Sequence, residues 1–186
     1  YSGGSSTGYG DNRGGTFMIV YGTAAFHNNG TLSFADNSRY YEKRGNGGVF
    51  YIGDGDTLSF TQNDNVSFSG NTASADTLIG AGGAIYAMRG AQLNFADNKS
   101  LSFEGNKALA VSSKTNVSIA TYHFSGGALY LIGTEDASAG STDTSTLTIS
   151  GNTSVDFRGN EARCDVTNQQ AFACYGGAIR SGDDTV

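Results

Sequence analysis

The chain has 186 residues, of which 15% are charged, and its net charge of −6 comes without any block of like charge. Because phosphate neutralisation needs a clustered basic surface, this balance argues against DNA or RNA as a partner. No apolar run reaches the roughly 20 residues that span a bilayer, so we expect no direct membrane insertion by this segment. The length suits one domain with a hydrophobic core.

Five glycine pairs divide the chain into repeats. They are Gly14-Gly15, Gly47-Gly48, Gly82-Gly83, Gly126-Gly127 and Gly176-Gly177. Two adjacent glycines permit a turn, or a close approach of two backbones, where a Cβ would clash. The spacing predicts an N-terminal flanking or capping segment over 1–13, then coils over approximately 14–46, 47–81, 82–125 and 126–175, and the start of a fifth over 176–186.

Each of the first four glycine pairs is followed by two segments that end in Phe-x-x-Asn or a near relative. The first set is Phe26/Asn29, Phe60/Asn63, Phe95/Asn98 and Ile149/Asn152, and the second set is Phe34/Asn37, Phe68/Asn71, Phe103/Asn106 and Phe157/Asn160. Apolar and polar residues alternate within each segment, as Leu58 and Phe60 do around Ser59, and this period of two predicts strands.

A three-strand unit that returns every 33 to 50 residues matches one coil of a right-handed parallel β-helix. We therefore predict an all-β solenoid of about four coils with three short strands each. The Phe columns should stack in its interior and the Asn columns should form ladders at the corners. Asn suits a corner because it tolerates left-handed backbone and can hydrogen-bond neighbouring backbone groups.

The repeats differ in length mainly between the second Asn and the next glycine pair, and the fourth also has a polar insert near 134–143. Insertions confined to one corner of a solenoid often carry binding. Tyrosines that alternate with the core positions of the first strand should form an exposed aromatic row, which either anchors a partner or shields the sheet. The candidate receptor-binding residues are therefore Tyr40, Tyr41, Arg44, Tyr51, Tyr86 and Tyr130.

Nine residues separate Cys164 from Cys174. Zinc sites use shorter spacings in paired groups, so a disulfide that closes a surface loop is favoured over two free thiols. We expect no metal, no cofactor and no catalytic residue. The sequence GDGDTL at Gly53–Leu58 resembles one calcium-binding repeat, but it has no tandem copy and predicts a polar turn. Asp36 and Asp97 are expected at equivalent corners two coils apart, with Gln62 between them.

Gly-Gly-Ala-(Ile/Leu/Val) interleaved with Phe-x-x-Asn resembles the repeats of the polymorphic membrane proteins of Chlamydia. The copies are GGAIY at Gly82, GGALY at Gly126 and GGAIR at Gly176, with degenerate forms at Gly14 and Gly47. The resemblance runs from about Gly14 to Arg180. It implies an autotransporter whose β-helical passenger lies on the bacterial surface or is secreted after cleavage, next to an outer-membrane barrel that this sequence does not contain.

The same resemblance implies an adhesin that binds a host cell-surface protein on epithelial cells. Two other readings stay open. One is a structural stalk or spacer that self-associates through its coil ends, because open strand edges invite pairing. The other, less favoured, is a carbohydrate-active β-helix enzyme, since such chemistry needs paired carboxylates on one outer face.

Overall fold

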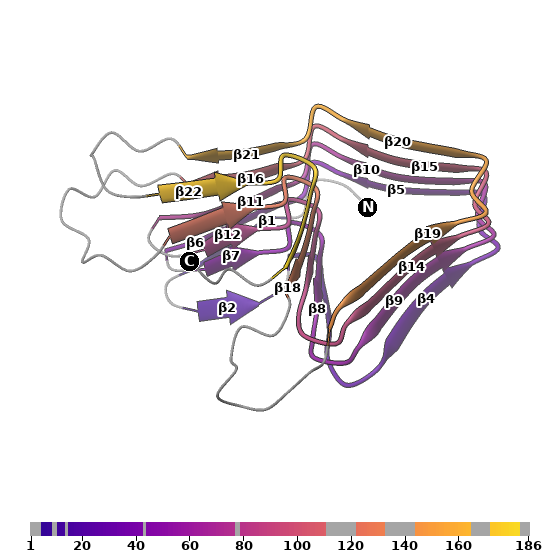
Figure 1. The fold of residues 1–186 in the computed structure, drawn as a ribbon, viewed down its shortest axis with the longest axis horizontal. Helices are drawn as coiled ribbons and strands as arrows, with labels where there is room; N and C mark the ends of the chain where they lie inside the picture. Colours follow the sequence, from indigo (N-terminus) through magenta and orange to yellow (C-terminus); the bar gives the residue numbers. More distant parts are fainter. Residues whose placement is uncertain are drawn as a thin grey trace.

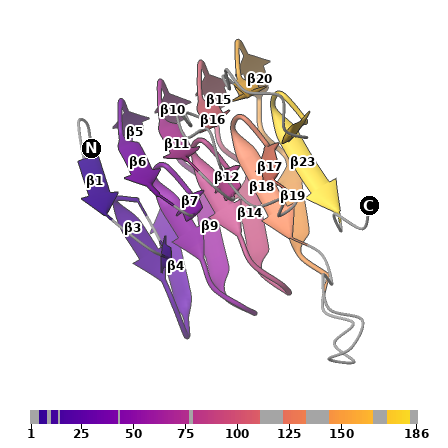
Figure 2. The ribbon, with the colours of Figure 1, turned by 90° about the vertical axis from the view of Figure 1, so that its left-hand side faces the viewer.

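The computed structural model describes residues 5–8, 11–13, 15–42, 44–76, 79–110, 122–132, 144–164 and 172–182. Every helix or strand in this part of the chain is a β-strand, and neighbouring strands pair in parallel (Figure 1). The strands form five sheets that run along one axis, with successive coils side by side (Figure 2). The predicted parallel β-helix is confirmed.

Three of the sheets enclose the main core. The first sheet contains β3 (Phe17–Ile19), β8 (Phe50–Ile52), β13 (Ile85–Ala87), β18 (Leu129–Ile132) and β23 (Ile179–Gly182). The second contains β4 (Thr23–His27), β9 (Thr57–Thr61), β14 (Gln92–Ala96) and β19 (Thr146–Ser150). The third contains β5 (Thr31–Ala35), β10 (Asn65–Ser69), β15 (Ser100–Glu104) and β20 (Ser154–Arg158).

Two further sheets extend to one side of this core (Figure 1). The fourth contains β1 (Ser5–Gly8), β6 (Ser38–Tyr41), β11 (Thr72–Ala75), β16 (Lys107–Ala110) and β21 (Glu161–Cys164). The fifth contains β2 (Asp11–Arg13), β7 (Arg44–Asn46), β12 (Ile79–Ala81), β17 (Tyr122–Ser125) and β22 (Phe172–Tyr175). The N-terminal segment that we expected to flank the repeats contributes β1 and β2, which pair with β6 and β7.

A coil therefore has five strands, and the prediction of three was wrong. The two additional strands lie between the second Asn and the next glycine pair, where we expected corner loops. A parallel neighbour one coil away supplies a hydrogen-bond partner to every extended main chain, even where the side chains are polar. The main-chain N–H and C=O groups of β6 and β7 are thus hydrogen-bonded, although the sequences of these strands show no apolar alternation.

Aromatic stacking fills the main core. Phe60 stacks on Phe26 and on Phe95, with ring centroids 4.7 Å and 5.3 Å apart. The column of the third sheet does the same, since Phe68 and Phe103 lie 4.7 Å apart. Between the two columns the rings meet edge to face, as Phe60 and Phe68 do at 5.6 Å and 88°. Both arrangements are favourable for aromatic quadrupoles, and the predicted interior position of the Phe columns is confirmed.

Candidate functional site

The corner between the second and third sheets is an asparagine ladder. Asn63 accepts hydrogen bonds through Oδ1 from both N and Nδ2 of Asn29, each at 2.9 Å. It then donates through Nδ2 to Oδ1 of Asn98 and to the carbonyl oxygen of Phe26, at 2.9 Å and 3.0 Å. Its own N–H also donates to Asn98 Oδ1. Every polar group of this buried side chain is satisfied, so Asn63 stabilises the coil rather than facing a ligand.

The corner between the third and fourth sheets repeats this ladder. Asn37, Asn71, Asn106 and Asn160 are joined by the same contacts from N and Nδ2 to the next Oδ1. The predicted corner ladders are confirmed. Our reason for them was partly wrong, because the left-handed residue is the one before each Asn. These residues are Asn28, Asp36, Gln62, Gly70, Asp97, Gly105, Gly151 and Gly159.

The second glycine of each of the first four pairs lies where two backbones nearly touch. A Cβ on Gly83 would meet the carbonyl oxygen of Gly127 at 2.0 Å, and a Cβ on Gly48 would meet that of Gly83 at the same distance. The first glycine, for example Gly82 or Gly126, has φ near +62°. Both roles exclude larger residues. The glycine pairs are thus needed by the scaffold.

The tyrosine row is buried, and the expectation that it is exposed was wrong. Tyr51, Tyr86 and Tyr130 are at most 3% exposed, and neighbouring rings stack 5.4 Å apart. They point away from the Phe core, as the alternation predicted, but β12 of the fifth sheet brings Ala81 against them, and Met88 packs there as well. The fifth sheet, which the sequence did not predict, turns this outer face into a second core.

The candidates on the Ser38–Asn46 segment belong to strands. Tyr41 is buried, and the guanidinium of the buried Arg39 lies 4.3 Å from the centre of its ring. Burial lowers the pKa of Arg39. Tyr40 is half-buried and donates through its hydroxyl to Asp76 at 2.8 Å. Arg44 is exposed. Alternation in β6 sends Arg39 and Tyr41 inward, so the structure leaves Arg44, and the edge of Tyr40, accessible to a partner.

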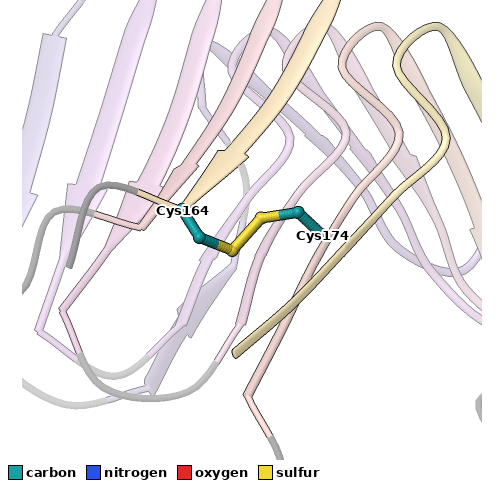
Figure 3. The surroundings of a disulfide bond; sticks show 2 residues. All are labelled: Cys164 and Cys174. Carbon is teal, nitrogen blue, oxygen red and sulfur yellow. A yellow bond between two sulfur atoms is a disulfide. The ribbon is translucent and has the colours of Figure 1, made fainter. Parts of the chain in front are cut away.

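A disulfide joins Cys164 to Cys174, as the cysteine spacing favoured. It links β21 of the fourth sheet to β22 of the fifth (Figure 3). Both cysteines pack against a small cluster formed by Ala75, Ala110 and Phe124. Cys164 pairs with Ala110 of the third coil, and Cys174 pairs with Phe124. The disulfide in the fourth coil therefore replaces the contact between Ala110 and Phe124 in the third coil.

The turn between β8 and β9 contains the GDGD sequence. Asp56 is buried, and its carboxylate accepts hydrogen bonds from the backbone N–H groups of Tyr21 and Gly22, at 3.1 Å and 2.6 Å. The carboxylate thus stabilises a turn, and the GDGD sequence forms a polar turn, as predicted. In the described part of the chain no cluster of His, Cys, Asp and Glu could hold a metal ion.

Tyr21 is a residue that the sequence analysis missed. It lies at the tip of the turn between β3 and β4, has φ of +64°, and is 97% exposed. A cavity of about 90 Å³ borders it and is lined by Val20, Tyr21, Tyr51, Gly53, Asp54 and Asp56. One feature of the sequence could have indicated this residue, namely the length of its turn, which is one residue shorter than the equivalent turn Gly53–Asp56.

The carboxylates that an enzyme would need are not brought together at Asp36 and Asp97. Asp36 lies at the corner of the third and fourth sheets beside Gly70, and Asp97 lies at the corner of the second and third sheets beside Gly151. Our expectation of equivalent corners was wrong, because the two residues belong to different Phe-x-x-Asn sets. The polar insert near 134–143 and the interior of the Cys164–Cys174 loop lie outside the described residues.

Residues 65–88 match the family model of the Chlamydia polymorphic membrane protein repeat. This stretch starts at β10 and ends just after β13, so it holds one Phe-x-x-Asn motif and one Gly-Gly-Ala motif. Neither a curated protein nor a solved structure matches the chain. The structure contains no helix, within its described ranges, that could cross a membrane. The match supports a segment that carries the repeat of the Chlamydia polymorphic membrane proteins, and the same motifs lie buried in successive coils of the structure.

Proposed function

We propose that this segment is part of an adhesin that binds a host epithelial cell-surface protein through outer-face and corner-loop residues. One observation carries the proposal. The Phe, Asn and Gly residues of the repeat pack or hydrogen-bond within the scaffold, as the ladder at Asn63 and the close backbone approach at Gly83 illustrate. Exposed positions such as Arg44, and the connections whose lengths differ between coils, remain for binding, and repeat proteins often place their binding residues in such connections.

The connections between β16 and β17, β18 and β19, and β21 and β22 support this choice of location. They join strands whose main chains pair with those of the neighbouring coils. Their length can therefore vary without changing the register of the core. Arg44, on the exposed side of β7, adds a positive charge on the fifth sheet, which also contains β17 and β22.

A spacer or self-associating stalk is the second candidate. The outer positions of the second sheet favour it, because they carry only small or uncharged side chains, which offer a partner few anchors. These positions are Thr23, Ala25, His27, Thr57, Ser59, Thr61, Gln92, Asn94, Ala96, Thr146, Thr148 and Ser150.

Binding of fragment-coated beads to epithelial cells separates the two candidates. We expect the folded fragment to bind, and a variant that lacks 134–143 but keeps the circular dichroism spectrum and unfolding midpoint of the parent to bind less. The matched control replaces Ser59 and Thr148, two outer positions of the second sheet, with alanine, which should leave binding unchanged. A folded fragment that does not attach to cells, or that only forms oligomers in sedimentation, would support the stalk instead.

A further inference from the structure

The cavity beside Tyr21 has the chemistry of a site for a basic side chain. We propose that this Tyr21–Asp54 pocket, defined by the six lining residues given above, binds the guanidinium or ammonium group of an Arg or Lys on a protein partner. The inference rests on the proposed function and adds the chemical class of residue that the pocket would take. It concerns a surface that none of the repeat motifs occupies.

The pocket exists because Gly53 has no side chain at a position where the next coil has Met88. Val20, Gly53 and Met88 follow directly on the paired residues Ile19, Ile52 and Ala87 and are therefore equivalent. In the later coil the Met88 side chain packs against the tyrosine row. Glycine leaves this space empty, and a Cβ on Gly53 would lie 2.5 Å from Oδ2 of Asp56.

Asp56 also holds the exposed wall of the pocket in place. Its two hydrogen bonds fix the backbone of Tyr21 and Gly22. A left-handed conformation is unfavourable for an aromatic residue and persists only where neighbouring groups impose it. Because these hydrogen bonds fix the turn, the backbone that carries the Tyr21 ring loses little freedom on binding.

The charge of the pocket selects the ligand. Asp54 is exposed at its rim and Asp56 lies in its wall, and the lining contains no basic residue. Within the described ranges no ion pair neutralises Asp54. The exposed carboxylate of Asp54 attracts a cation through its charge, and the exposed ring of Tyr21 adds the attraction of its quadrupole. The volume of about 90 Å³ is well below that of a small-molecule site, roughly 300–1,000 Å³, and suits one side-chain head group.

Titration with small probes tests the chemistry directly. The probes are the acetylated methylamides of arginine and lysine, with the norleucine compound as an uncharged control of similar length, and the readout is the NMR signals of Tyr21, Gly53 and Asp54. We expect saturable shifts with the two basic probes only. Asp54→Asn and Tyr21→Asn should each weaken binding about two- to fivefold. Asn is chosen at position 21 because it tolerates the left-handed backbone.

Asp36→Asn is the matched control, since it removes one carboxylate from a distant corner and should leave the affinity unchanged. Equal shifts with norleucine, no saturation at these three residues, or equal weakening by Asp36→Asn would each overturn the inference. A concentration-dependent dimer that Asp54→Asn abolishes would also overturn it, because the occupant would then be a second copy of the chain.

Bead binding to cells separates this inference from the proposed function. Reduced attachment of the Asp54→Asn fragment, with normal attachment of Asp36→Asn, would support the role of the pocket. Full attachment of Asp54→Asn would overturn that role and leave the adhesin proposal intact. If the parent fragment does not attach while the arginine probe still saturates the pocket, the adhesin proposal fails and the pocket chemistry stands.

Discussion

Asn98 and Asn152 lie on successive coils, and the side-chain amide of Asn98 donates to Oδ1 of Asn152 at 2.9 Å. The same amide donates to the carbonyl oxygen of Phe60 on the coil before, at 3.0 Å. One buried side chain therefore ties three coils together. Because the contact repeats along both ladders, the order of coils is held by directional hydrogen bonds in addition to aromatic stacking.

Replacing a ladder residue should be costly. Asn98→Ala removes the acceptor of Asn63 N and Nδ2 and leaves the Phe60 carbonyl without this donor. Buried polar groups without a partner cost roughly 1–3 kcal/mol each, so we expect a loss of about 3 kcal/mol or more in urea unfolding. Asn65→Ala is the control, because the Asn65 side chain is exposed and its hydrogen bond to Thr31 is long, at 3.4 Å. Equal losses in the two variants would contradict the ladder as the stabilising element.

The glycine pairs give a second prediction. Gly83→Ala places a Cβ 2.0 Å from the carbonyl oxygen of Gly127 and 2.5 Å from Lys107 N. Both atoms belong to backbone, which cannot move away as a flexible side chain would. We expect a loss of about 3 kcal/mol or more, or failure to fold. Gly30→Ala has no atom within 4 Å of the new Cβ, so its unfolding midpoint should stay within experimental error of the parent.

The sequence predicts the interior well because stacking imposes a strict register. Phe60 and Phe95 pair directly in the sheet, so their spacing within each repeat cannot drift. The eight left-handed corner residues were open to prediction too, since four of them are glycines, including Gly70 and Gly105, directly before an Asn. That signal identifies the position before the Asn, while we assigned the left-handed backbone to the Asn itself.

The outer tyrosines could not be predicted in the same way. Alternation correctly places the side chains of Tyr51 and Phe50 on opposite faces of the sheet, but it does not predict which residues cover the outer face. The cover comes from Ala81 at the end of β12, a strand whose short, glycine-containing sequence has no apolar period. β12 forms because its main chain pairs with the neighbouring coils, and such pairing cannot be predicted from the apolar pattern of one short segment.

The tyrosine row gives a third prediction. Tyr86→Ala should lower the free energy of unfolding by about 3–5 kcal/mol, because it empties a buried site between two stacked rings. Tyr21→Ala removes an exposed ring and should cost less than about 0.5 kcal/mol. Chemical denaturation of both variants checks the pair. A stable Tyr86→Ala fragment that had lost cell binding would restore the row as a binding surface, against the burial seen here.

The disulfide gives the last prediction. Cys164 pairs with Ala110 one coil earlier, so Cys164→Ala keeps a residue that the neighbouring coil already accommodates at this place. Joined with Cys174→Ala, it removes a bridge that closes a loop with a sequence separation of 10. Loop-closure entropy predicts a loss of about 3 kcal/mol. Solenoid stability is set by nearest neighbours, so the effect should concentrate in the last coil.

Amide hydrogen exchange of the oxidised parent, the reduced parent and the double alanine variant measures this distribution. Amides of β21 and β22 should exchange faster once the bridge is lost, and those of β9 and β10 should not change. The reduced parent serves as the control for the substitutions, since it has the parent sequence without the bond. Uniform acceleration along all coils would mean that the bridge stabilises the whole solenoid as one cooperative unit, and the nearest-neighbour description would then be wrong for this chain.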